Sequence, residues 1–272
     1  MIAPSVGVKG GIMIRVGIGG WNYEPWKGTF YPKGLKAADE LRYAGEHLTT
    51  IEINGTFYRT QSEASFARWR DETPDDFVFS VKGHRAVVNK KVLAEAGEAI
   101  AWFYASGILA LGDKLGPVLW QFAPHKKFDA DFAAFLDLLP REKAGRELRH
   151  VVEVRSKTFL VPEFVDLARE HGVAVVYADS DDYPAIADVT APFVYLRLQR
   201  TAEEIETGYS DADLDRWAER TRTFAAGGTP ADLACHHPQA AAPQPRDVYA
   251  YMIAGAKVRA PAAAMALIER VG

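Results

Sequence analysis

Short runs of β-branched and aromatic residues alternate with longer amphipathic stretches along the whole chain. Most of the short runs are bounded by glycine, proline or polar residues, which is typical of β-strands. We therefore predict eight strands, at residues 14–20, 50–54, 77–83, 117–122, 150–155, 173–179, 193–199 and 247–253.

The longer stretches carry apolar residues three and four positions apart, the spacing of one face of a helix. Several have signals of a helix end: Ser62 stands before Glu63, and Gly172 and Gly227 follow helical runs. We predict helices at residues 37–48, 62–72, 91–115, 129–139, 161–172, 211–228 and 260–271.

Alternating strands and helices over 272 residues favour a single (β/α)8 TIM barrel, a fold of the α/β class. We expect the barrel to span residues 14–272, after a loose extension at 1–13. The connection between the sixth and seventh strands, residues 180–192, is short and has room for about one helical turn. Residues 227–246 are rich in Ala, Pro and Gln, which predicts a low-complexity loop insertion before the eighth strand.

An open doubly wound sheet is the alternative fold. Such a sheet usually has a glycine-rich nucleotide-binding loop after its first strand. The segment GIGGWNYEPW lacks the G-x-G-x-x-G spacing, and Trp21 and Trp26 would crowd a pyrophosphate. The barrel is therefore the favoured fold.

The composition is that of an ordered protein without a strongly charged surface. Hydrophobic residues make up 48% of the chain, which is enough for a sizeable core. The net charge of −4 gives no sign of a global electrostatic partner such as nucleic acid or a membrane surface. Cys235 is the only cysteine, which fits a reducing compartment. We find no long apolar segment and expect a soluble, cytoplasmic protein.

Polar side chains lie late in several strands, on the face opposite a row of aliphatic residues. In the second strand, Ile51 and Ile53 share one face while Glu52 and Asn54 share the other. In a closed parallel barrel the aliphatic rows pack on the helices, so the polar sets should meet at the C-terminal mouth, where barrel enzymes build their sites. The alternative is an internal ion-pair network that closes the top of the barrel, because buried charges are usually paired.

Serial motifs at the same strands resemble those of the YecE-like proteins, domain-of-unknown-function family 72. They are GIGGWNYEPWKGTFYP, TIEINGTFYR, FVFSVKG, LGDKLGPVLWQF, VVEVRSKTF and VYLRLQR. The resemblance runs from about Ile14 to the end of the chain and implies a TIM barrel; the family has no established activity.

Two segments depart from the pattern of that family. Where the family commonly has a Tyr-Arg-x-His-Gly type sequence after the seventh strand, this chain has Leu198, Gln199 and Arg200. Where the eighth strand commonly ends in Phe-Asn-Asn-Asp, this chain has residues 252–255, MIAG. Roles of those family residues are therefore not carried over to this chain.

The residues expected at the mouth form a mixed cluster of carboxylates and cations, which can shift pKa values in either direction. The candidate catalytic residues are Glu52, Glu153, Asp179 and Lys82. The candidate substrate-binding residues are Trp21, Tyr23, Asn54, Tyr58, His84, Gln121, Arg155 and Arg197. The pattern favours an enzyme that acts on a small anionic, sugar or phosphoester substrate, with hydrolase, lyase and isomerase chemistry all open.

A divalent metal is one alternative, held by the acidic candidates together with His84. The interleaved cations and the lack of an H-x-H or H-E-x-x-H pattern count against it, and the sequence requires no cofactor. A Schiff base on Lys82 is another alternative, although a lysine beside carboxylates is more often an ion-pair partner. The adjacent Cys235, His236 and His237 are interpreted as loop residues, since metal sites normally need spaced ligands.

The second class of function is a non-catalytic module that binds a ligand or nucleic acid. A basic run follows the third strand, at Lys82, His84, Arg85, Lys90 and Lys91. The acidic net charge and the carboxylates expected in the mouth weigh against nucleic acid. We expect no membrane partner, and the sequence leaves the oligomeric state open.

Overall fold

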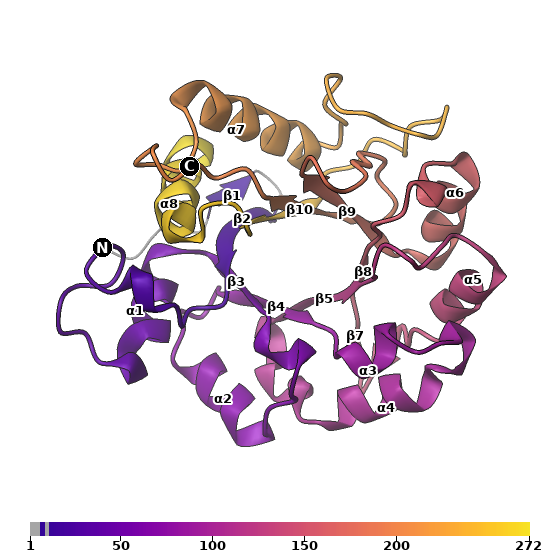
Figure 1. The fold of residues 1–272 in the computed structure, drawn as a ribbon, viewed down its shortest axis with the longest axis horizontal. Coiled ribbons are helices and arrows are strands. Elements are labelled where there is room, and N and C mark those ends of the chain that lie inside the picture. The colour runs from indigo at the N-terminus through magenta and orange to yellow at the C-terminus, as the bar shows by residue number, and fades with distance from the viewer. Residues whose placement is uncertain (1–5, 9–10) are drawn as a thin grey trace.

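Eight parallel strands close into a barrel with helices around it (Figure 1). The computed structural model describes residues 6–8 and 11–272. The barrel strands are β2 (Ile12–Gly19), β3 (Thr50–Ile53), β4 (Val78–Lys82), β5 (Leu115–Gln121), β8 (His150–Glu153), β9 (Ala174–Asp179), β10 (Phe193–Leu198) and β11 (Asp247–Met252). They pair in this order, and β11 closes the ring by pairing parallel to β2. The predicted TIM barrel is confirmed.

Helices lie outside the strands and cover the barrel (Figure 1). They are α1 (Glu40–His47), α2 (Glu63–Asp71), α3 (Arg85–Val88), α4 (Gly97–Ala105), α5 (Ala130–Asp137), α6 (Pro162–His171), α7 (Asp211–Ala225) and α8 (Ala260–Val271). The connection from β9 to β10, residues 180–192, contains no helix, in line with its predicted shortness. Among the described residues, no helix is long and apolar enough to cross a membrane.

The helix predicted over residues 91–115 is wrong as one continuous element. It divides into the 3-10 helix η4 (Leu93–Glu95), α4 and the 3-10 segment η5 (Ile108–Lys114). The break lies at Gly107, whose φ of 106° places it in the left-handed region. A Cβ atom there would come within 2.6 Å of the backbone nitrogen of Glu63, so the close packing of this turn on α2 requires glycine.

Two small strand pairs lie outside the barrel. Of the predicted extension at 1–13, residues 1–5 and 9–10 lie outside the described residues, and β1 (Val6–Val8) pairs antiparallel to the start of β2. The hairpin of β6 (Glu142–Lys143) and β7 (Arg146–Glu147) was not predicted. Its two central residues both have positive φ, as the tight turns of hairpins require.

The two faces of each barrel strand pack in different parts of the core. Ile51 and Ile53 of β3 are buried in the main hydrophobic core between strands and helices. The side chains of the opposite face fill the barrel interior, where Tyr195, Tyr249 and Tyr251 form a stack of rings with neighbouring centroids 5.0–6.3 Å apart. This aromatic plug fills the interior below the strand ends and leaves the C-terminal end to polar residues.

Candidate functional site

Arg197 of β10 connects two carboxylates inside the barrel. Its Nη2 donates to Oε1 of Glu52 at 3.0 Å, and its Nη1 donates to Oε2 of Glu153. The three residues are only 3%, 0% and 1% exposed, respectively. Because β3, β8 and β10 are separated around the barrel, this guanidinium crosses the interior and compensates the two buried negative charges.

Glu153 collects further donors at the end of β8. Arg155 pairs with its Oε1 at 2.8 Å, and Gln121 Nε2 donates to its Oε2 at 2.9 Å. Burial alone would raise the pKa of Glu153, but the charges of Arg197 and Arg155 outweigh burial and hold the pKa below its usual value. Glu153 is therefore ionised at neutral pH.

Lys82 extends the network from β4 towards the mouth. Its Nζ donates to Gln121 Oε1 at 2.7 Å and lies 4.4 Å from the centre of the Phe57 ring. Burial and the positive charge of Arg197 lower the pKa of Lys82 from 10.5 to about 8. The ammonium is thus linked through the amide of Gln121 to Glu153, and its protonation responds to the whole cluster.

The second carboxylate oxygen of Glu52 contacts a group of buried hydroxyls. The Tyr195 hydroxyl donates to Glu52 Oε2 at 2.7 Å, and it lies 2.7 Å from Ser80 Oγ. Ser80 in turn donates to the carbonyl of Pro117 at 2.8 Å. Burial and the charge of Glu52 raise the pKa of Tyr195 well above its usual value, so Tyr195 remains a donor. This role of Tyr195 was not predicted, although its place two residues before Arg197 puts both side chains on one face of the strand.

Asp179 belongs to a separate ion pair at the end of β9. Arg200 contacts its Oδ1 at 2.9 Å and also reaches Asp181 at 2.9 Å. Burial raises the pKa of Asp179, and the charge of Arg200 opposes that rise without cancelling it. No hydrogen bond between described residues links this pair to the Arg197 cluster.

The other candidates lie at or beyond the rim. Arg155 stacks its guanidinium 4.1 Å from the centre of the Tyr183 ring. His84 accepts from the backbone of Ala86 at 3.0 Å and packs on Trp102, so it caps a short helix outside the cluster. Tyr58 is 67% exposed.

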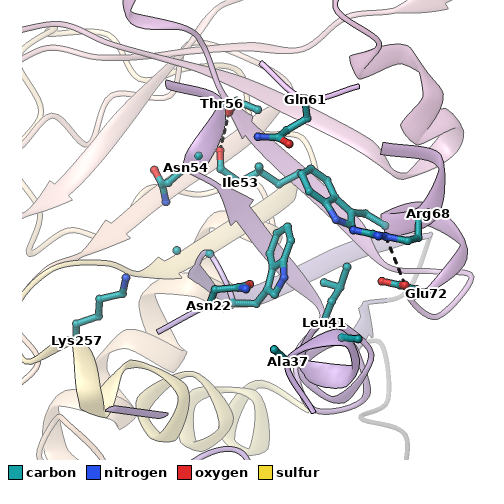
Figure 2. Close-up of a pocket in the computed structure, with 16 residues that line it drawn as sticks. Asn22, Ala37, Leu41, Ile53, Asn54, Thr56, Gln61, Arg68, Glu72 and Lys257 are labelled. Atoms are coloured by element: carbon teal, nitrogen blue, oxygen red, sulfur yellow. Dashed lines mark hydrogen bonds and ion pairs between the residues drawn. The ribbon is translucent and has the colours of Figure 1, made fainter. Parts of the chain in front are cut away.

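A cavity of about 510 Å³ lies at the end of β3, where Ile53 and Asn54 line it (Figure 2). Its walls come from the segments after β2, β3 and β11 and from α1 and α2, so it opens at the C-terminal end of the barrel. Trp21 and Asn54, two of the candidate substrate-binding residues, line it. No pattern in the sequence indicates its helical contributors, Arg68 and Trp69.

Thr56 joins the cavity to the ion network. It lines the cavity, and its hydroxyl lies 2.7 Å from the carbonyl of Lys82 and 3.1 Å from that of Ile53. The next residue, Phe57, packs under the Lys82 ammonium. One short 3-10 turn, η3 (Gly55–Phe57), therefore forms a wall shared by both sites.

Among the described residues, no three His, Cys, Asp or Glu side chains are grouped so that they could hold one metal ion. The acidic members of the suggested metal set are instead paired with arginines. In the segment Cys235–His237, the cysteine is exposed and the two histidine backbones donate to Asp188 at 2.7 and 3.0 Å. These contacts attach the segment to the connection before β10.

The family profile described as "Protein of unknown function DUF72" matches residues 15–272. The chain belongs to the DUF72 family. This membership confirms the resemblance to the YecE-like proteins that the strand motifs carry.

Two curated relatives match part of this DUF72 chain. UPF0759 protein YunF of Bacillus subtilis (strain 168) is 23% identical over 193 residues, which cover 67% of this chain and 65% of YunF. UPF0759 protein YecE of Escherichia coli (strain K12) is 28% identical over 142 residues, which cover 51% of this chain and 49% of YecE. The matched regions span less than two thirds of YunF and about half of YecE.

Solved structures of the family share the fold. A DUF72 family protein from Thermotoga maritima has a TM-score of 0.69 and 23% identity, and the match covers 94% of this chain and 97% of that one. A DUF72 family protein from Enterococcus faecalis V583 has a TM-score of 0.69 and 16% identity, with 95% of each chain covered. At these identities the likeness shows the barrel and nothing of the chemistry.

Proposed function

We propose that this DUF72 chain is an enzyme that acts on a small anionic, sugar or phosphoester substrate by acid/base chemistry at the C-terminal mouth of the barrel. The observation that carries the proposal is the environment of Lys82, whose pKa is lowered to about 8 by burial and by Arg197. A lysine that titrates this close to neutral pH can both take up and release a proton during turnover.

Glu52 and Glu153 raise the proton affinity of Lys82 against the larger effects of burial and Arg197. Both carboxylates are buried and held by Arg197, so they act through their charge on groups nearer the mouth. Their negative charges raise the pKa of Lys82, whereas burial and the arginines lower it. Asp179, with its raised pKa, is a second group able to exchange a proton at the mouth.

The charge of the cluster favours an anionic substrate. Lys82, Arg155 and Arg197 face the two carboxylates, which leaves one positive charge in excess when the lysine is protonated. The Nε atom of Arg197 is buried and hydrogen-bonds no described residue. Arg155, whose side chain is 20% exposed, is placed to pair with an incoming carboxylate or phosphate.

The test is turnover of the purified protein with a panel of phosphomonoesters, sugar phosphates and sugar acids. We expect a limb near the Lys82 pKa of about 8 in the pH profile of kcat/KM, and a loss of about 100-fold or more in the Lys82→Met variant. The Lys143→Met variant is the control, because Lys143 is exposed in the β6–β7 hairpin before the N-terminal end of β8. Ligand binding without any turnover would contradict the proposal and favour a non-catalytic binding module.

A further inference from the structure

We infer that the cavity between β3, α1 and α2 binds a monosaccharide that carries one acidic group, either a phosphate or a carboxylate. This inference goes beyond the proposed function: the cavity is a second site that Lys82 does not line, and its binding of a ligand does not depend on turnover at Lys82. It is carried by the shape of the apolar wall, the amide side chains around it and one cation without a carboxylate partner.

The apolar wall is a rigid corner made by two indole rings. Trp21 and Trp69 meet edge to face, with ring centres 4.9 Å apart and planes at 78°. The Trp21 backbone is held by the Tyr31 hydroxyl, which donates to its carbonyl at 2.7 Å. A pyranose ring presents C–H groups on its faces and hydroxyls around its edge, so it can lie against one indole while its hydroxyls point away from the corner.

Side-chain amides surround this corner. Asn22, Asn54 and Gln61 line the cavity, and in Figure 2 Asn54 and Gln61 lie at its upper side with Asn22 below them. Asn22 is exposed, and the Asn54 and Gln61 amides donate to the backbone carbonyls of Glu52 and Arg59 at 3.3 and 3.5 Å, so their amide oxygens remain as acceptors. An amide offers both donors and acceptors, which suits hydroxyl groups.

Glycines make room for these amides. A Cβ atom at Gly19 would come within 2.8 Å of Nδ2 of Asn54, so only glycine there lets the amide lie where it does. Gly20 has a φ of 70°, and a Cβ there would meet no atom within 4 Å. Because glycine has no side chain, the backbone next to Trp21 stays uncovered.

Lys257 supplies the positive charge. Its ammonium lies 4.5 Å from the centre of the Tyr23 ring and 5.4 Å from that of Trp26, and Figure 2 places it on the Asn54 side of the cavity. Among the described residues no carboxylate lies within ion-pair distance of it, whereas Arg68 on the opposite side faces Glu72 at 3.7 Å. The cavity therefore has one uncompensated cation, which matches one acidic group on the ligand.

The volume agrees with this class. About 510 Å³ falls within the roughly 300–1,000 Å³ of small-molecule sites and exceeds the size of a single hexose phosphate. A flat nucleobase fits the same space less well, because the two rings form a corner instead of a parallel slot.

The experiment is calorimetric titration of the full chain with glucose 6-phosphate, glucuronate, glucose, inorganic phosphate and adenosine monophosphate. We expect at least one of the two acidic sugars to bind about tenfold or more tightly than glucose and inorganic phosphate. Tighter binding of the phosphate sugar would identify a sugar phosphate as the ligand, and tighter binding of glucuronate a sugar acid. No heat with either acidic sugar, or tighter binding of adenosine monophosphate, would overturn the inference.

Three variants test the residues. Lys257→Gln should weaken the acidic sugar about tenfold or more and leave glucose unchanged, and Gly19→Ala, which displaces the Asn54 amide, should weaken both. Lys143→Gln, at an exposed site in the β6–β7 hairpin, should change neither. Equal binding by Lys257→Gln and the wild type would overturn the assignment.

The Lys82→Met variant separates this inference from the proposed function. It should bind the acidic sugar as the wild type does, because Lys82 does not line the cavity. If the wild type binds the acidic sugar but turns over no compound of the panel, only the proposed enzyme is contradicted. If the wild type turns over the panel but the cavity variants bind the acidic sugar as tightly as the wild type does, only the assignment of the cavity is contradicted.

Discussion

The Nη2 atom of Arg197 lies 3.0 Å from Oε1 of Glu52, and both side chains are buried inside the barrel. The same guanidinium holds Glu153 with its other terminal nitrogen. Arg197, Glu52 and Glu153 therefore form one electrostatic unit, in which the loss of one member leaves other charges buried and unpaired.

Removal of this cation should cost much stability. In Arg197→Met the side-chain volume is largely kept, but Glu52 loses its cation and Glu153 keeps only Arg155. We expect the free energy of unfolding to fall by about 3–5 kcal/mol, measured by urea denaturation at neutral pH.

The matched control for Arg197 is Arg200→Met, which breaks the pairs with Asp179 and Asp181. The Arg200 side chain is 47% exposed, so its loss should cost about 1 kcal/mol or less. If Arg197→Met and Arg200→Met lowered the free energy of unfolding by similar amounts, burial would not explain the contribution of Arg197.

The stability of the protein should depend on the protonation of Lys82. Its pKa is lowered from 10.5 to about 8 in the folded state, so the unfolded chain binds more protons between these values. The free energy of unfolding contributed by this group therefore rises with pH across that window. The free energy of unfolding of the wild type minus that of Lys82→Met should therefore increase from about pH 7 to about pH 10.5, as measured by denaturation. A constant difference would contradict the lowered pKa.

The break between α4 and η5 should tolerate no side chain. At Gly107 an added Cβ would approach the Glu63 backbone to 2.6 Å with φ at 106°, so Gly107→Ala should destabilise the fold by about 1–3 kcal/mol. Gly55→Ala is the control, since a Cβ there meets nothing within 4 Å and its φ is not positive. Equal midpoints of thermal unfolding for both variants would refute this reading of the turn.

The strands and the barrel follow from local patterns, and so do many of the site positions. Each barrel strand combines an aliphatic row with a second face, and this alternation placed Glu52, Lys82, Glu153 and Arg197 at one end of the interior. Periodicity carries this information because residues two apart in a strand share a face.

Other features depend on contacts between distant segments. Apolar spacing continues across residues 91–115, and only the packing of Gly107 on Glu63 shows why the helix breaks there. Trp69 shows helical periodicity like any core residue, yet it lines the cavity next to Trp21 from the first connection. The hydrogen bond from Tyr195 to Glu52 likewise joins β10 to β3 across the interior, and sequence spacing does not reveal such a partner.

The pKa of Lys82 decides whether the barrel holds an acid/base centre, and NMR can measure it through the pH dependence of the Lys82 ε-methylene signals. The Lys82→Arg variant assigns those signals. We expect a pKa of about 8 in the wild type and a lower value in Glu153→Gln, because the charge of Glu153 raises the pKa of Lys82. A value near the ordinary 10.5 that does not change in Glu153→Gln would contradict the proposed acid/base centre.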